Sequence, residues 1–244
     1  ATHDGMPQGN AAFAGTQFTV KYYNGYYDKD SLPRTPVRTW VLQVRKMEDP
    51  DGGPSGYRAA LDERHKVSGD DFYMQDGNAV LPFGTVTIEE TKAPAGYLLE
   101  QFYVKAEGSK ETHSGLYISQ IREGQNGISL IGGSQYAVYD QVIRGGVKIR
   151  KRDFETKGAL PQGGADFEKA VFIIVNLNEN QVTVNGKSYG RNDQVAVMQT
   201  DQNGVAQTEK DLLPYWKYRI IETGAPAGYL EEGVLCQEFS VTEN

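Results

Sequence analysis

One eleven-residue string occurs twice in this chain, and it constrains the fold more than any other feature of the sequence. Residues 88–98 read Ile-Glu-Glu-Thr-Lys-Ala-Pro-Ala-Gly-Tyr-Leu, and residues 220–230 read Ile-Ile-Glu-Thr-Gly-Ala-Pro-Ala-Gly-Tyr-Leu. Each copy follows a Leu-Pro-aromatic turn, at residues 81–83 and 213–215. Two such copies predict two related domains within the 244 residues.

A second pair of similar strings lies near the start of each half, at residues 7–18 and 161–172. These opening strings are 154 residues apart, whereas the glutamates of the longer motif, Glu90 and Glu222, are 132 apart. The first half therefore carries 22 extra residues between the two landmarks. We expect them in the turn-rich stretch 24–78, because surface loops accept insertions at little cost in stability.

Short segments rich in Val, Ile, Thr and Tyr alternate with turns, and no long stretch has a helical period. This pattern predicts an all-β protein made of two tandem antiparallel β-sandwiches. The expected strands are 18–23, 39–44, 57–61, 85–89, 116–121, 136–139, 147–151, 171–176, 181–184, 195–200, 218–221 and 238–242.

The domain boundary is expected near Ile143-Arg144-Gly145-Gly146, where two glycines make a short connection between strands. The predicted domains are therefore 1–144 and 145–244. We expect the first domain to have enlarged loops and to lack its first strand, and the second to lack its last strand. Only 22 residues follow Glu222, whereas the equivalent span from Glu90 runs to about residue 140.

Two local features each leave an alternative open. Asn203-Gly204 predicts a hairpin turn, because Asn-Gly accepts positive φ, and a calcium loop is the less favoured interpretation. The aromatic run at residues 22–27, together with Trp40, favours a cross-strand aromatic ladder over a ligand-binding patch.

Composition and charge exclude several classes of function. A net charge of −7 argues against a nucleic-acid surface, which needs a basic face. No apolar run approaches the roughly 20 residues of a membrane span. The single cysteine, Cys236, rules out a disulfide within the chain and is expected to be a plain strand residue. His3, His65 and His113 lack metal-ligand spacing, so we expect solvated loop histidines, no metal and no cofactor.

The two glutamates are predicted to point inward. Side chains alternate along a strand, so Glu222 continues the face of Tyr218 and Ile220, and Glu90 continues the corresponding apolar face of the first copy. An inward carboxylate is costly unless it is paired or protonated, and burial raises its pKa. The plainer alternative is a turn signature in which the glutamate bonds only to backbone amides.

The string Glu-Thr-x-Ala-Pro-x-Gly-Tyr resembles the glutamate box of Cna B-type domains, the prealbumin-like repeats of Gram-positive adhesins and sortase-assembled pilins. Residues 147–153, Val-Lys-Ile-Arg-Lys-Arg-Asp, resemble the first strand of such domains, and the resemblance covers nearly the whole chain in two copies. It implies an intramolecular isopeptide bond, in which a first-strand lysine joins an Asn or Asp of the last strand while the glutamate assists. A lysine buried in apolar surroundings becomes a nucleophile, and a protonated glutamate can move the protons.

The resemblance assigns these roles to particular residues. Lys151 matches the lysine of the second domain and Glu222 its glutamate, whereas Lys148 lies an odd number of residues away and faces the other side. Glu90 matches the glutamate of the first domain, and Asp140 matches its acceptor.

Each predicted site lacks one partner. The counterpart of Lys151 in the first domain would precede Ala1, and Lys21 should point to solvent because it alternates with Phe18 and Val20. Asn244 comes too early in the second domain to be its acceptor.

The resemblance implies a structural role, not an enzyme. We expect a stalk or backbone segment of an extracellular, cell-wall-anchored surface protein or pilin, in contact with neighbouring domains of the same protein. One alternative is an adhesin module that binds a host protein or glycan through residues 24–78. Another is an accessory β-sandwich of a secreted enzyme.

Overall fold

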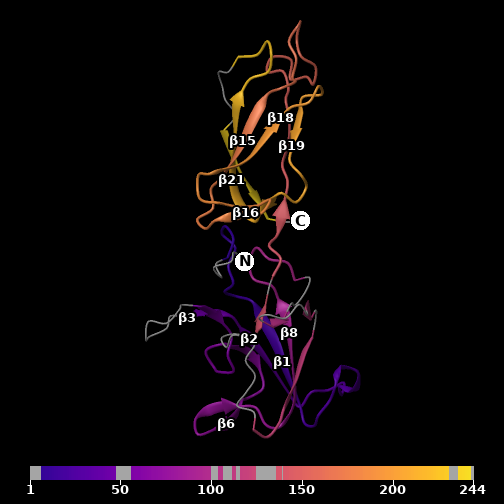
Figure 1. Cartoon of the computed structure of the whole chain (residues 1–244), viewed down its shortest axis with the longest axis vertical. Helices are drawn as coiled ribbons and strands as arrows, with labels where there is room; N and C mark the ends of the chain where they lie inside the picture. Colours follow the sequence, from indigo (N-terminus) through magenta and orange to yellow (C-terminus); the bar gives the residue numbers. More distant parts are fainter. Residues whose placement is uncertain are drawn as a thin grey trace. The chain divides into compact units, whose positions relative to one another are not determined.

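The computed structural model describes residues 7–47, 56–99, 104–106, 112–113, 116–124, 136–138, 140–230 and 236–242. The chain forms two compact units (Figure 1). The first unit is Ala12–Gln141, and the second unit combines Ala1–Ala11 with Val142–Asn244. The first unit thus ends at Gln141, three residues before the end of the predicted first domain. Residues 1–11, which the prediction placed in the first domain, group with the second unit.

The first unit holds the described strands β1 to β12 and one short 3-10 helix. Their bounds are β1 Gln17–Tyr23, η1 Lys29–Ser31, β2 Arg38–Gln43, β3 Arg45–Met47, β4 Gly56–Arg58, β5 Lys66–Gly69, β6 Tyr73–Gln75, β7 Asn78–Val80, β8 Gly84–Lys92, β9 Val104–Ala106, β10 Thr112–His113, β11 Tyr117–Ile121 and β12 Tyr136–Val138.

The second unit holds the described strands β13 to β22. Their bounds are β13 Arg144–Gly145, β14 Lys148–Arg150, β15 Val171–Asn176, β16 Val182–Val184, β17 Lys187–Tyr189, β18 Gln194–Gln199, β19 Val205–Gln207, β20 Leu213–Pro214, β21 Trp216–Gly224 and β22 Cys236–Val241.

All described strand pairs are antiparallel. In the first unit the main sheet has the order β11-β8-β1-β2-β5, and a smaller sheet has the order β10-β9-β12. In the second unit the main sheet has the order β18-β15-β21-β22, of which Figure 1 labels β15, β18 and β21. Strand β14 pairs with β19. Each of the twelve expected strands overlaps an observed one, so the all-β prediction is confirmed.

The core of the second unit lies between its main sheet and the short strand pairs. Phe172 and Ile174 of β15 and Tyr218 of β21 are fully buried, and they pack with Val182 of β16 and Leu213 of β20. Side chains from several sheets thus meet in one apolar layer, as in a sandwich. Because β15 alternates buried and half-buried positions, its period of two decides which residues face this layer.

Residues 7–11, which we call the strap, bind to the second unit. The Gly9 N–H donates to the Gln181 carbonyl at 3.0 Å, and the Asn180 side chain donates to the Gly9 carbonyl at 2.7 Å. Gly9 has a φ of 57°, and a Cβ there would lie 2.9 Å from the Tyr215 carbonyl oxygen, so only glycine fits without strain. Two further bonds run from the Thr183 N–H to Gln8 Oε1 and from the Glu179 N–H to Asn10 Oδ1.

A turn forms at Asn203-Gly204, but the strands that it joins do not pair with each other as the predicted hairpin would require. Gly204 has a φ of 69°, and Asp201 Oδ1 accepts hydrogen bonds from the N–H groups of Asn203 and Val205. The strands on either side, β18 and β19, belong to different sheets. The turn therefore carries the chain from one layer of the second unit to the other.

Four aromatic residues of the first unit, Tyr22, Trp40, Phe72 and Tyr73, belong to one core cluster, whereas Tyr26 is exposed. Trp40 is fully buried and packs against Phe72 and Tyr73, and Tyr22 packs edge-on against Tyr73. Val20 lies opposite Trp40 in the β1–β2 register. The aromatic residues of this cluster thus supply packing area inside the unit and not an exposed ligand patch.

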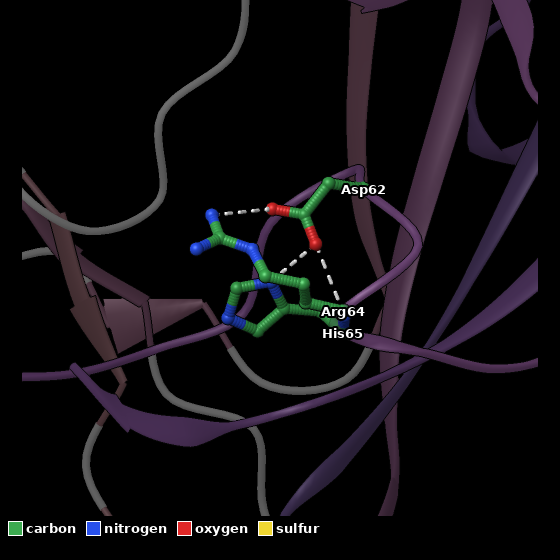
Figure 2. Close-up of polar contacts among 3 residues, drawn as sticks. All are labelled: Asp62, Arg64 and His65. Carbon is green, nitrogen blue, oxygen red and sulfur yellow. Dashed lines mark hydrogen bonds and ion pairs between the residues drawn. The ribbon is translucent and has the colours of Figure 1, made fainter.

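His65 is buried, which corrects the expectation of a solvated loop histidine. Its side chain is inaccessible to solvent, and its Nδ1 lies 2.7 Å from Asp62 Oδ1. Figure 2 shows the imidazole next to the Asp62 carboxylate. The same oxygen accepts from the His65 N–H, and Arg64 contacts the other carboxylate oxygen at 3.4 Å. The loop thus buries an imidazole by pairing it with a carboxylate three residues earlier. His3 lies outside the described residues.

Candidate functional site

Strand β21 places Glu222 at the end of its buried face. Glu222 is opposite Phe172 of β15, two residues beyond Ile220, which is opposite Ile174. Tyr218 and Ile220 are buried, and the Glu222 side chain is 13 % exposed. The inward orientation predicted from strand parity is thus observed.

Lys151 follows β14 and meets Glu222. The Lys151 N–H donates to the Gly204 carbonyl at 2.8 Å, which fixes its backbone beside the Asn203-Gly204 turn. Its Nζ donates to Glu222 Oε1 at 2.7 Å, and the Lys151 side chain is 21 % exposed. Lys148 is exposed. Of the two lysines, Lys151 is therefore the one that contacts the glutamate, as strand parity predicts.

Asp153 fixes the chain just beyond the lysine. Its Oδ1 accepts hydrogen bonds from the N–H groups of Glu155 and Thr156 and from the Gln162 side chain. The Tyr229 hydroxyl donates to Oδ2 at 3.0 Å. These bonds, the Thr156 N–H first among them, lower the pKa of Asp153 to about 2. The tyrosine of the repeated motif thereby links the glutamate strand to the lysine strand, a role that the sequence analysis missed.

Strand β8 places Glu90 in the equivalent position of the first unit. Glu90 is opposite Phe18 of β1, and Ile88 is opposite Val20. Val86 is fully buried and Glu90 is 8 % exposed. Phe18 and Phe172 are separated by the same 154 residues as the opening strings, so each glutamate has an equivalent phenylalanine opposite it.

Glu90 is paired with Asp140, which follows β12 by two residues. Burial first, and then the charge and hydrogen bond of Asp140, raise the pKa of Glu90 from 4.5 to about 8. Burial also raises the pKa of Asp140, although its hydrogen bond with Glu90 lowers it. Glu90 Oε1 and Asp140 Oδ1 are both buried without a hydrogen-bond partner. The pair is therefore a protonated acid site at neutral pH.

The sequence repeat is also a repeat of contacts. In each unit the motif tyrosine donates its N–H to the motif proline, and its ring packs 5.3 Å from a phenylalanine of the opening string. The pairs are Tyr97 with Pro94 and Phe13, and Tyr229 with Pro226 and Phe167. The two units thus hold their glutamates on equivalent frameworks.

The structure brings together the four predicted residues in two pairs, Lys151 with Glu222 and Asp140 with Glu90. Their chemical roles stay predictions. Lys21 is opposite Thr39 and Thr87, off the face of Phe18 and Val20. Asn244 lies outside the described residues. Within the described ranges, no group of three or more His, Cys, Asp or Glu is placed to hold a metal, and no helix is long and apolar enough to cross a membrane.

Comparisons with solved structures found chains of low identity. The Bacillus anthracis TIE protein is 17 % identical with a TM-score of 0.43, over 96 % of this chain and 50 % of that one. BcpA, the major pilin subunit of Bacillus cereus, is 14 % identical with a TM-score of 0.29, over 96 % and 92 %. The pilus adhesin SpaC from Lactobacillus rhamnosus GG is 16 % identical with a TM-score of 0.35, over 99 % and 27 %. The chain thus spans half the length of the TIE protein.

A comparison with curated protein sequences found no match. Residues 145–244 match the family SpaA, described as a prealbumin-like fold domain. This range contains Lys151, which follows β14, the strand β21 with Glu222, and the second copy of the motif. It therefore confirms the resemblance seen in the sequence for the second copy, and residues 145–244 are similar to the SpaA prealbumin-like fold domains.

Proposed function

We propose that this chain is a structural segment of a Gram-positive cell-surface protein or pilin, strengthened by Lys–Asn or Lys–Asp isopeptide bonds. The observation that carries the proposal is the contact of Lys151 Nζ with Glu222 Oε1 at 2.7 Å in a largely buried site. Ordinary surface ion pairs are solvated and contribute little to stability, so a lysine enclosed in this way needs another purpose.

The arrangement suits amide formation. Lys151 must lose a proton before its amine can attack, and Glu222 is within hydrogen-bond distance to take it. The amine then attacks the side-chain carbonyl of an Asn or Asp on an adjoining strand, and the glutamate returns the proton to the leaving ammonia or water. One C–N bond forms for each ammonia or water released, and the reaction occurs once in each molecule.

The role of such a bond is mechanical. A covalent link between the first and last strands of a sandwich constrains the unfolded chain as a disulfide does. It also carries tension through covalent bonds, so that the strands cannot be pulled apart. This suits an extracellular segment whose 244 residues hold one cysteine, so that no disulfide can form among them.

The test is the intact mass of a polypeptide of the parent protein that contains residues 145–244 together with an adjoining strand carrying an Asn or Asp. We expect a mass lower than the sequence mass by one ammonia or one water. Glu222→Ala and Lys151→Arg should restore the full mass, since arginine keeps the charge but is not a nucleophile. Lys148→Arg is the matched control and should keep the loss. A full mass in the parent polypeptide would refute the proposal.

A further inference from the structure

We infer that residues 161–165 form a second strap, and that this second strap binds the strap site of a second copy of this chain. The strap site is the surface of the second unit that holds residues 7–11, and it consists of residues 178–183 and the Tyr215 carbonyl. The inference concerns association between copies, so it goes beyond the proposed function and does not depend on any isopeptide bond.

The two opening strings form the same turn. Residues 7–11 read Pro-Gln-Gly-Asn-Ala, and residues 161–165 read Pro-Gln-Gly-Gly-Ala. The glycine in the middle of each turn, Gly9 or Gly163, has a φ of 57°. In both turns the alanine N–H donates to the glutamine carbonyl at 3.0 Å. The second strap therefore has the backbone shape that the strap site accepts.

Each turn is also held at the same point of the repeated motif. Ala12, which follows the first turn, donates its N–H to the Ala95 carbonyl at 3.1 Å. Asp166, which follows the second turn, donates its N–H to the Ala227 carbonyl at 3.2 Å. Ala95 and Ala227 occupy the same position in the two copies of the motif. The second strap is thus fixed to its motif as the first turn is.

The strap site binds four groups of the first turn. These groups are the Gly9 N–H and carbonyl and the side-chain oxygens of Gln8 and Asn10. Asn178 supports the site from beneath, because it is fully buried and its Oδ1 accepts from the Lys217 N–H at 3.0 Å. A satisfied buried amide of this kind makes its surroundings rigid. The strap site therefore has a fixed shape that selects this turn.

The second strap offers three of the same four groups. Among the described hydrogen bonds, none uses the Gly163 N–H or carbonyl. Gln162 donates its Nε2 to two carboxylates at 3.0 Å, which fixes the side chain and leaves Oε1 as an acceptor. The fourth group is missing, because Gly164 stands at the position of Asn10. The second strap should therefore bind the strap site more weakly than residues 7–11 do.

The two turns differ in what covers them. Gly9 is buried, and a Cβ on it would lie 2.9 Å from the Tyr215 carbonyl oxygen. Gly163 is exposed, and a Cβ on it would meet nothing within 4 Å. The same turn is thus covered in one repeat and left open to solvent in the other.

Apolar side chains beside the second strap are exposed as well. Leu160, which precedes the turn, is 80 % exposed, and Leu230, in the motif that holds the turn, is 81 % exposed. Leu98, the equivalent of Leu230 in the first copy, is half-buried. Large apolar side chains gathered at one exposed place are typical of an interaction surface. They indicate that a protein partner covers the second strap.

The strap site and the second strap lie at opposite ends of β21. The strap site is bonded to Lys217, at the start of this strand. The second strap packs beside Gly228, beyond the end of the strand, where a Cβ would lie 2.6 Å from the Ala165 Cβ. Since the two surfaces differ, their contact is heterologous, and copies can join head to tail in a series.

The copy's own strap competes with this association. Residues 7–11 are part of the same molecule as the strap site, so their effective concentration at the site is high. A second strap from another copy therefore binds when residues 7–11 are displaced.

The test displaces the strap with Gly9→Val in the whole chain and measures molecular mass by sedimentation over a range of concentrations. Valine is strained at a φ of 57° and would meet the Tyr215 carbonyl, so it keeps the strap out of the site. We expect Gly9→Val to form dimers and larger species at concentrations where the wild type stays monomeric. Adding Gly163→Val should return the Gly9→Val chain to a monomer. Gly77→Val, at another exposed glycine of positive φ, is the matched control and should leave the association unchanged.

Two further measurements identify the surfaces in contact. Gly164→Asn supplies the missing oxygen and should tighten the association of Gly9→Val roughly fivefold, as one added hydrogen bond does. A peptide of residues 159–167, blocked at both ends, should dissociate the oligomers because it competes for the strap site. A monomeric Gly9→Val chain would overturn the inference, and so would oligomers that survive Gly163→Val, as aggregates of misfolded chains would. The proposed function is tested by the mass of a covalent product, so either one can fail while the other holds.

Discussion

The two units place the same glutamate at the same point of the same framework and give it opposite partners. Glu222 faces an ammonium group, Lys151, whereas Glu90 faces a second carboxyl, Asp140. Each is opposite a phenylalanine and precedes an Ala-Pro-Ala-Gly-Tyr turn. The motif therefore determines where the glutamate lies, and the neighbouring strand determines its charge.

The largest expected loss of stability comes from replacing the phenylalanine that lies opposite the glutamate in each unit. Phe172→Ala and Phe18→Ala should each destabilise their own unit by about 3–5 kcal/mol, the usual loss for a buried phenylalanine. Phe172 should lie at the upper end, because it is fully buried in the larger cluster. Urea unfolding followed by hydrogen-exchange mass spectrometry would resolve each unit. Val197→Ala, at an exposed position, is the control. A greater loss of stability in Phe18→Ala than in Phe172→Ala would contradict this ranking.

Replacing each glutamate with glutamine should change the stability of the two units by different amounts. Glu222→Gln leaves Lys151 enclosed beside an amide and should cost the second unit about 1–3 kcal/mol, less than a fully buried pair would. Glu90→Gln replaces a neutral acid by a neutral amide, so at neutral pH the first unit should change by less than about 0.5 kcal/mol. The unfolding midpoint of each unit is the readout. Equal losses in both units would show that Glu90 is charged.

The two units should respond to pH in opposite directions. The pKa of Glu90 is raised from 4.5 to about 8, so its contribution to the first unit is complete below pH 4.5 and is lost as pH rises through 8. The pKa of Asp153 is lowered from 3.8 to about 2, so its contribution to the second unit is present above pH 3.8 and is lost as pH falls through 2. Urea midpoints measured across the acid and mildly alkaline range would show both slopes. Glu90→Gln should flatten the pH dependence of the first unit. A loss of stability near pH 8 that persists in this variant would contradict its assignment to Glu90.

The smallest effect tests the link between the motif tyrosine and the lysine strand. Tyr229→Phe removes the hydrogen bond to Asp153 and should lower the stability of the second unit slightly, by less than Glu222→Gln does. The first unit should not respond, and Tyr26→Phe, at an exposed position, is the control. An unchanged second unit would mean that Asp153 is held by its backbone bonds alone. Thermal unfolding of the variant checks this.

The strands and the inward glutamates were predictable because both follow from local alternation. A period of two along residues 171–176 and 218–222 decides which side chains meet the core, and no long-range information is needed. Lys151 was separable from Lys148 by the same parity. The pairing of Glu90 with Asp140 needed the family resemblance, since nothing local connects residues 50 positions apart.

Other features depended on contacts that local patterns do not contain. The short strands β13 and β20 pair Arg144 with Pro214, and neither segment has a strand-like run of residues. His65 is buried only because Asp62 turns back to meet it. The Pro-Gln-Gly string of the strap suggested the start of a domain, and its binding to residues 179–183 had no signal in the sequence.

The strap has a consequence for the order of folding. Its hydrogen bonds close loops of 169 to 175 residues, an entropic cost that grows with loop length. Within the first unit, however, Ala12 donates to Ala95, and Leu98 donates to Gln141, so one motif gathers both ends of that unit. Once the first unit has folded, the loop that the strap must close is shortened by nearly the whole unit. We therefore expect the strap to dock more readily once residues 12–141 have folded.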